Sequence, residues 1–141
     1  QFLDNYFDEI DWVFHLAGIA DIGASVTYPS NFFNTNVKGT LNVLEAAKKA
    51  KIKKFIYTAS ASCYGTSDQY PTNEKIRINP KNPYATTKFL GEQLVIDWAK
   101  IYHMPNISLR FFNVYGLRSN KRVCSCQRCS RSNYGSSEKR G

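Results

Sequence analysis

Residues 54–65, KFIYTASASCYG, decide the fold, because an apolar run changes here into small and polar residues. Its first part, residues 54–59, predicts a strand, and similar runs occur at residues 11–17 (DWVFHLA) and 107–113 (ISLRFFN). Short apolar runs of this kind are typical of strands that are buried in a parallel sheet. The sequence therefore predicts three buried parallel strands.

Two helical patterns separate these strands. Residues 31–50 predict a helix with Ser30 as its N-cap, and residues 84–103 predict a second helix with Pro83 in its first turn. The expected buried stripes are Phe33, Val37, Leu41, Leu44 and Ala47 in the first helix, and Leu90, Leu94, Trp98 and Ile101 in the second. The order strand, helix, strand, helix, strand predicts an α/β fold, a parallel sheet with helices on its faces.

A ligand site is expected at one edge of this sheet. Parallel α/β sheets bind ligands at the carboxyl ends of their strands. Three segments lie at those ends, residues 15–20, 60–65 and 113–116, and all three are rich in small or polar residues. The chemistry of the chain is therefore sought in these segments and in the helix that follows the second.

Tyr84 and Lys88 are the first candidates for that chemistry. They stand four residues apart on a predicted helix, so their side chains share one face. An ammonium group favours the phenolate form of a neighbouring tyrosine, which makes the pair a workable general base. The alternative is a solvated lysine beside a half-buried tyrosine. With 9 Tyr and 12 Lys in 141 residues such pairs arise by chance, so the context has to decide.

Ser60 supplies the context, since it closes the strand 24 residues before Tyr84. This arrangement resembles the Ser and Tyr-x-x-x-Lys site of the extended short-chain dehydrogenases/reductases, in the NAD-dependent epimerase/dehydratase group. Three more segments resemble that family, and they are HLAG (15–18), NVKGTLNVLEAA (36–47) and SLRFFNVYG (108–116). The resemblance implies a Rossmann-like, doubly wound parallel sheet, NAD as cofactor and a sugar nucleotide as substrate.

The resemblance also implies roles for individual residues. Tyr84 would take the proton from a sugar hydroxyl, Lys88 would hold the nicotinamide ribose, and Ser60 would hydrogen-bond the reacting oxygen. The implied cofactor-binding residues are His15, Ala17, Gly18, Asn36, Tyr84 and Lys88, and the implied substrate-binding residues are Ser60, Ser62 and Asn113. For four of these a plainer interpretation stays open: His15 as a core histidine, Asn36 as a capping or packing amide, Gly18 as a turn residue and Asn113 as the end of a strand.

The residues after Ser60 separate two reactions. Dehydratases of the family usually carry an Asp-Glu pair there, since elimination of water needs an acid and a base, whereas this chain has Ala61 and Ser62. The resemblance is therefore to epimerases of the UDP-hexose 4-epimerase type. The alternatives are a dehydratase or reductase of the same family, and a non-catalytic dinucleotide-fold module that binds a partner.

The resemblance implies that the chain is a fragment. Residues 1–118 are expected to form a partial NAD-binding domain, without the family's glycine-rich loop, first strands and C-terminal substrate domain, so NAD and NADP cannot be told apart. Residues 119–141 form a basic tail rich in Ser and Cys, which we expect to be disordered or frame-shifted. Cys124, Cys126 and Cys129 have the spacing of zinc ligands, but no Cys or His follows them, and we expect no metal.

Charge and composition favour a protein without nucleic-acid or membrane partners. The net charge is +8, but residues 117–141 hold 7 of the 19 Lys and Arg and 1 of the 11 Asp and Glu, so the basic character belongs mostly to the tail. No apolar run approaches the roughly 18 residues of a membrane span, and the acidic N-terminus is unlike a signal peptide. We therefore expect a cytoplasmic protein, and the parent of the fragment is expected to be a homodimer.

Overall fold

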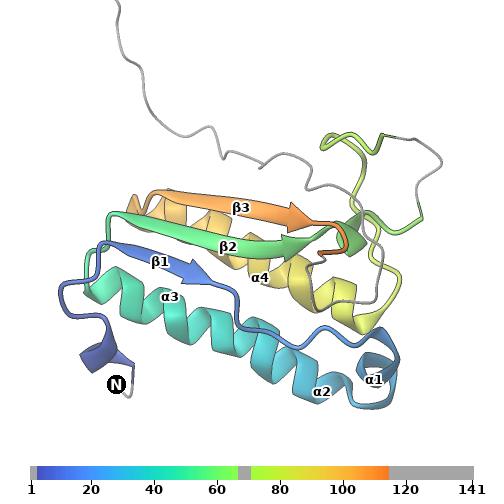
Figure 1. The fold of residues 1–141 in the computed structure, drawn as a ribbon, viewed down its shortest axis with the longest axis horizontal. Coiled ribbons are helices and arrows are strands. Elements are labelled where there is room, and N and C mark those ends of the chain that lie inside the picture. The colour runs from blue at the N-terminus through green and yellow to red at the C-terminus, as the bar shows by residue number, and fades with distance from the viewer. Residues whose placement is uncertain (1–2, 67–70, 115–141) are drawn as a thin grey trace, which may run out of the picture.

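The computed structural model describes residues 3–66 and 71–114, and its three strands form one parallel sheet (Figure 1). The elements in chain order are η1 (Asp4–Tyr6), β1 (Trp12–His15), α1 (Ile22–Thr27), α2 (Pro29–Phe32), η2 (Phe33–Lys38), α3 (Gly39–Lys49), β2 (Lys54–Ser60), η3 (Ala61–Tyr64), α4 (Pro83–Tyr102) and β3 (Asn106–Phe111). This order confirms the predicted α/β fold. The expectations for residues 115–141, among them Gly116 and the cysteine-rich tail, lie outside the described residues.

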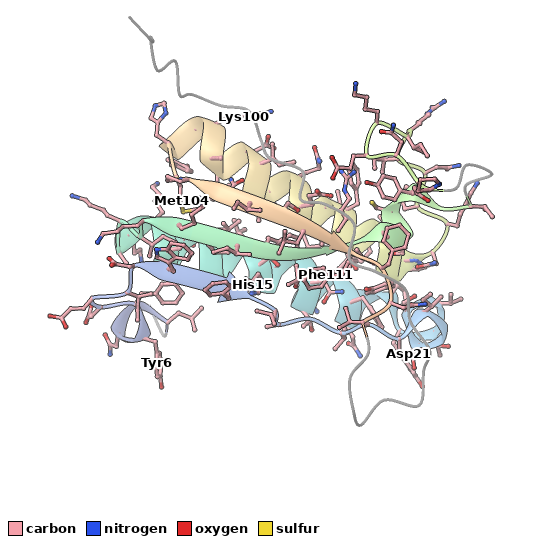
Figure 2. All side chains as sticks on the ribbon, turned by 45° about the horizontal axis from the view of Figure 1, so that its top comes forward. Tyr6, His15, Asp21, Lys100, Met104 and Phe111 are labelled. Carbon is pink, nitrogen blue, oxygen red and sulfur yellow. The ribbon has the colours of Figure 1, made fainter. Side chains whose placement is uncertain are left out.

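The register of the sheet brings the ends of its strands together. The strand order is β1-β2-β3, with Phe14 beside Ile56 in one pair and Tyr57 beside Ser108 in the other. Figure 2 shows His15 and Phe111 toward the same end of the sheet, and Met104 at the opposite end. The segments that follow β1, β2 and β3 therefore meet at one edge, as the sequence predicted.

Both long helices, α3 and α4, lie on the same side of the sheet (Figure 1). Between them and β2 lies the core, in which Leu44, Phe55, Tyr57 and Val95 are fully buried. On β1 the prediction of a buried strand is wrong for one face, because Phe14 is 60% exposed. Only the side of β1 toward α3 is covered by the described residues.

The helix predicted for residues 31–50 is formed by three consecutive segments, α2, η2 and α3. The first of them begins at Pro29, and Tyr28 before it makes no side-chain cap, so Ser30 is not the N-cap. The middle segment, η2, is a π-helix, which fits more residues into each turn than an α-helix and so rotates the inward face. The expected apolar stripe is therefore only partly buried. Phe33 is 40% exposed, while the polar Asn36 and Thr40 are buried.

Helix α4 begins as the sequence predicted and buries a different face. Asn82 caps it by accepting a hydrogen bond from the Ala85 backbone N–H at 2.8 Å, and Pro83 lies in the first turn. The expected stripe is half-buried or exposed. The residues that are buried are Ala85, Thr87, Lys88, Gly91, Glu92 and Val95. Polar side chains thus form much of the inner face of α4.

The described residues contain neither a helix that could span a membrane nor a group of side chains that could hold a metal ion. Within residues 3–66 and 71–114, no helix combines the length and apolar character of a membrane span. In the same ranges no group of three or more His, Cys, Asp or Glu side chains could hold a metal ion.

Gly65 should be intolerant of a side chain. Its φ of 69° lies in the region that favours glycine, and an added Cβ would overlap the Asn79 carbonyl oxygen. We expect Gly65→Ala to lower the free energy of unfolding by about 1–3 kcal/mol, the usual cost of such backbone strain. Urea denaturation measures it, with Gly23→Ala as control, because a Cβ at Gly23 meets only ordinary contact. Equal stability of both variants would contradict the prediction.

Candidate functional site

A cavity of about 520 Å³ opens at the carboxyl edge of the sheet. Its walls come from the segments after β1, β2 and β3 and from the first turns of α4. Six of the residues expected at a site line it, and they are Gly18, Ser60, Ser62, Tyr84, Lys88 and Asn113. The structure therefore brings residues from four separate segments of the chain to one cavity, at the edge of the sheet where the sequence predicted a ligand site.

Ser60 and Ser62 form a pair of hydroxyl groups at the end of β2. Ser60 caps the short helix η3, and its Oγ accepts a hydrogen bond from the Ser62 backbone N–H at 3.2 Å. The two Oγ atoms are 2.8 Å apart and hydrogen-bonded to each other. This local capping fixes both hydroxyls at the cavity, where one can donate to a ligand while it accepts from the other.

Tyr84 and Lys88 reach the cavity from α4. Tyr84 is half-buried, whereas Lys88 is only 7% exposed. The interpretation of Lys88 as a solvated lysine is therefore wrong. An ammonium group so deeply buried is costly unless nearby groups stabilise its charge, so its surroundings decide its ionisation.

The groups around Lys88 offset part of the cost of burying its positive charge. Burial lowers the pKa of Lys88 to about 8, and the negative charge of Glu92, one turn further along α4, acts in the opposite direction. The Lys88 Nζ also lies 4.7 Å from the centre of the Tyr57 ring. At neutral pH Lys88 is consequently protonated in most molecules, yet it is close enough to its pKa to respond to small changes around it.

His15 and Ala17 are not among the residues that line the cavity. The His15 side chain is buried, and its Nε2 lies 2.9 Å from the Thr40 Oγ1. Burial, and secondarily the charge of Lys88, lower the pKa of His15 to about 4, so the ring is neutral at physiological pH. Its side chain fits the interpretation of a core histidine. Ala17 is exposed beside the cavity.

Asn36 also lies outside the cavity wall, and it holds that wall in place. Its side-chain amide bonds both backbone groups of Ile19, accepting from N–H at 2.9 Å and donating to C=O at 3.0 Å. The same amide donates to Thr87 on α4 at 3.1 Å. A Cβ at Gly18 would lie 3.1 Å from the Asn36 Oδ1, so a glycine lets the loop pass close to this clamp.

A buried polar cluster behind the cavity was missed by the sequence analysis. Glu92 is fully buried and pairs with Arg110, whose Nε lies 2.9 Å from Oε2. Ser108 donates to the same carboxylate at 2.9 Å, and Arg110 donates to the Tyr64 hydroxyl at 2.9 Å. Burial opposes the charge of Arg110, but Tyr64 and Glu92 outweigh it and raise the Arg110 pKa.

A signal for this cluster was present in the sequence. Glu92 follows Lys88 by four residues and therefore shares its helix face. Ser108 and Arg110 are two residues apart in a predicted strand, so their side chains point to the same face of the sheet. Three polar residues at such positions indicate a satisfied network rather than solvated side chains.

A parallel sheet with its cavity at the carboxyl edge defines the chain as a Rossmann-like α/β protein. The sequence model of the NAD dependent epimerase/dehydratase family matches residues 1–131. The chain therefore belongs to this family. The match continues past Arg118, where the resemblance seen in the sequence ends.

Several epimerases are similar to the chain. The putative UDP-arabinose 4-epimerase 4 of Arabidopsis thaliana is 36% identical over 115 residues, which are 82% of this chain and 26% of that protein. The structure of UDP-N-acetylglucosamine 4-epimerase from Methanobrevibacter ruminantium M1, in complex with UDP-N-acetylmuramic acid, matches with a TM-score of 0.80 and 30% identity, over 89% of this chain and 40% of that one.

A third relative was crystallised with the cofactor. UDP-glucose 4-epimerase from Brucella ovis in complex with NAD matches with a TM-score of 0.71 and 34% identity, over 73% of this chain and 32% of that one. The family is NAD-dependent by its description, and the chain spans well under half of the length of each of these relatives.

The buried neutral His15 should make stability depend on pH. The unfolded chain binds a proton at His15 near pH 6.5 and the folded chain only near pH 4, so the unfolded state binds more protons between these values. The free energy of unfolding should therefore fall as the pH drops from about 6.5 to about 4, by up to about 3 kcal/mol from this group. Urea denaturation across this range measures it.

His15→Gln should remove that part of the pH dependence, whereas His103→Gln, at an exposed position after α4, should retain it. An identical slope in His15→Gln and the unchanged chain would show that His15 is not responsible.

Proposed function

We propose that this chain carries the catalytic residues of an NAD-dependent sugar-nucleotide 4-epimerase. The observation that supports the proposal best is the lining of one cavity by Ser60, Tyr84 and Lys88. They come from the end of β2 and the first turns of α4, which are separated by a long connection. A protein that only binds a partner through this fold has no need for a base, a cation and a hydroxyl at the same cavity.

The residues at the cavity suit the nicotinamide half of NAD. Gly18 and Ala20 place small residues in a wall that also includes apolar side chains such as Ile19, and Lys88 offers an ammonium group that can donate to ribose hydroxyls. His15, Ala17 and Asn36 would contribute by shaping the segment after β1 on that side. When bound, NAD supplies an acceptor for hydride, a capacity that side chains lack.

The chain's own residues would handle the proton and the substrate. Tyr84 takes the proton from the sugar hydroxyl as the carbon beside it is oxidised, and later returns the proton to the oxygen. The Lys88 ammonium stabilises negative charge on the Tyr84 oxygen. Ser60 donates a hydrogen bond to the reacting oxygen, and Ser62 and Asn113 bind other polar groups of the substrate.

The residues next to Ser60 favour epimerisation over elimination of water. Ala61 and Ser62 have no carboxylate to place at the reacting carbon, and the Ser62 hydroxyl is hydrogen-bonded to that of Ser60. One base with a reversible hydride is enough to invert a carbinol carbon. We therefore favour the epimerase over a dehydratase or reductase of the family, and the names of the similar proteins favour a UDP-sugar as its substrate.

A cytoplasmic homodimer without nucleic-acid or membrane partners stays a prediction.

Removing the Tyr84 hydroxyl should abolish most of the activity. In a chimera, residues 12–114 replace the matching segment of the Brucella ovis enzyme, so that the site is tested within a complete protein. We expect Tyr84→Phe to lower turnover of UDP-glucose by about 10²–10⁴, the usual contribution of a positioned acid/base group, with NAD content unchanged.

The control is Tyr28→Phe, since Tyr28 is 62% exposed and does not line the cavity. Circular dichroism and bound NAD establish that each variant is folded. Full turnover by a folded Tyr84→Phe chimera would overturn the mechanism.

The products should distinguish epimerase from dehydratase. We expect the chimera to interconvert the C4 epimers of UDP-glucose or UDP-N-acetylglucosamine and to release no 4-keto-6-deoxy sugar, because no carboxylate pair follows Ser60. NMR of the reaction mixtures identifies the products, with dTDP-glucose as the control substrate. Accumulation of the keto-deoxy sugar would favour the dehydratase.

A further inference from the structure

The ring of Tyr57 forms the floor beneath the Lys88 ammonium. The Lys88 Nζ lies 4.7 Å from the ring centre, within the range of about 6 Å over which a cation is attracted to an aromatic face. The Tyr57 hydroxyl lies 3.4 Å from the Lys88 carbonyl oxygen, to which it donates. Tyr57 thus contacts Lys88 twice, with its ring at the charged end and with its hydroxyl at the backbone.

We propose that Tyr57 is a positioning residue, whose ring seats the Lys88 ammonium at the cavity and helps to keep it charged. The importance of this role for catalysis rests on the proposed function, but the contact itself does not. Tyr57 lies in the middle of β2 and is fully buried, so its ring is packed within the core. Burial raises the pKa of Tyr57, which therefore remains a neutral phenol with an intact electron-rich face.

Gly91 shows that the position of this ring is specified. Gly91 lies three residues after Lys88 on α4, and a Cβ there would overlap the Tyr57 hydroxyl. The same Cβ would lie 3.1 Å from the Asn36 carbonyl oxygen. Helix α4 therefore approaches β2 at a point where only a glycine leaves room for the phenol, and that approach sets the height of Lys88 above the ring.

The other charged and titratable groups around Lys88 do not replace the ring. Glu92 stabilises the cation, but its carboxylate is bound by Arg110 through two hydrogen bonds. His15, on β1, is neutral at physiological pH. Tyr84 lines the same cavity from α4. The uncharged Tyr57 ring thus stabilises the Lys88 ammonium and offsets part of the free-energy cost of burying it.

The ionisation of Lys88 in the complete 141-residue chain tests the proposal. NMR of lysine labelled with ¹³C at Cε follows each lysine against pH, and Lys88→Arg assigns its signal. We expect the Lys88 midpoint near pH 8 to be retained in Tyr57→Phe, which keeps the ring, and to fall by about 0.4–1.5 pH units in Tyr57→Leu, the range that loss of a cation–π contact produces.

A second series keeps the shape of the ring constant, since Tyr57→Leu leaves a cavity in the core. Tyr57 is replaced by phenylalanine and then by 3,5-difluoro- and 3,4,5-trifluorophenylalanine, which withdraw charge from the aromatic face in steps. The Lys88 midpoint should fall with each step while the melting temperature stays nearly constant. A role in packing alone would move the melting temperature and leave the titration unchanged.

Two outcomes would overturn the proposal: a Lys88 midpoint that does not change through the fluorinated series, or a shift in Tyr57→Phe as large as in Tyr57→Leu. Neither depends on turnover. If the chimera proved inactive while the fluorinated series shifted the Lys88 midpoint, the proposed function would be wrong, but the positioning role of Tyr57 would be supported.

Discussion

The buried ion pair between Glu92 and Arg110 is the interaction on which the geometry of the cavity depends. A carboxylate without exposure to solvent is tolerated only with a charged partner and further donors, and removing one partner of such a pair typically costs about 3–5 kcal/mol. Here the pair joins α4 to β3, and Arg110 continues to Tyr64 in η3. Helix α4 carries Tyr84 and Lys88, and Ser60 caps η3. The ion pair, which lies behind the cavity, therefore holds Tyr84 and Lys88 in place relative to Ser60.

The same pair sets the electrostatics of the cavity. Glu92 raises the Lys88 pKa while burial lowers it, and burial is the larger influence. Because Arg110 bonds both oxygens of the carboxylate, Glu92 acts on Lys88 across one helical turn. The lysine then keeps its donors for the cavity. Structural support and tuning of the lysine are thus two effects of one buried charge pair.

The sequence predicted the strands, their parallel arrangement and the edge that carries the cavity, because these follow from local residue types. It did not predict which faces of the helices are buried. Asn36, Thr40, Lys88 and Glu92 are buried although hydrophobic patterns assign polar residues to solvent, and their partners are distant in sequence. The π-helix at residues 33–38 added a second error, because an extra residue in one turn moves every later side chain around the axis. The roles assigned to Ser60, Tyr84 and Lys88 stay predictions, although the cavity they share is observed.

The fit of the Tyr57 hydroxyl against Gly91 makes the evolution of these two positions dependent on order. Alanine at position 91 would be rejected while a phenol stands at position 57, since the Cβ and the hydroxyl occupy the same space. If the hydroxyl were lost first, that overlap would disappear, and the Cβ would lie 3.1 Å from the ring carbon and from the Asn36 carbonyl oxygen, which would each have to move by a few tenths of an ångström. The two positions are thus coupled, because loss of the Tyr57 hydroxyl removes the overlap that excludes alanine at position 91, so the cost of Gly91→Ala depends on which residue stands at position 57.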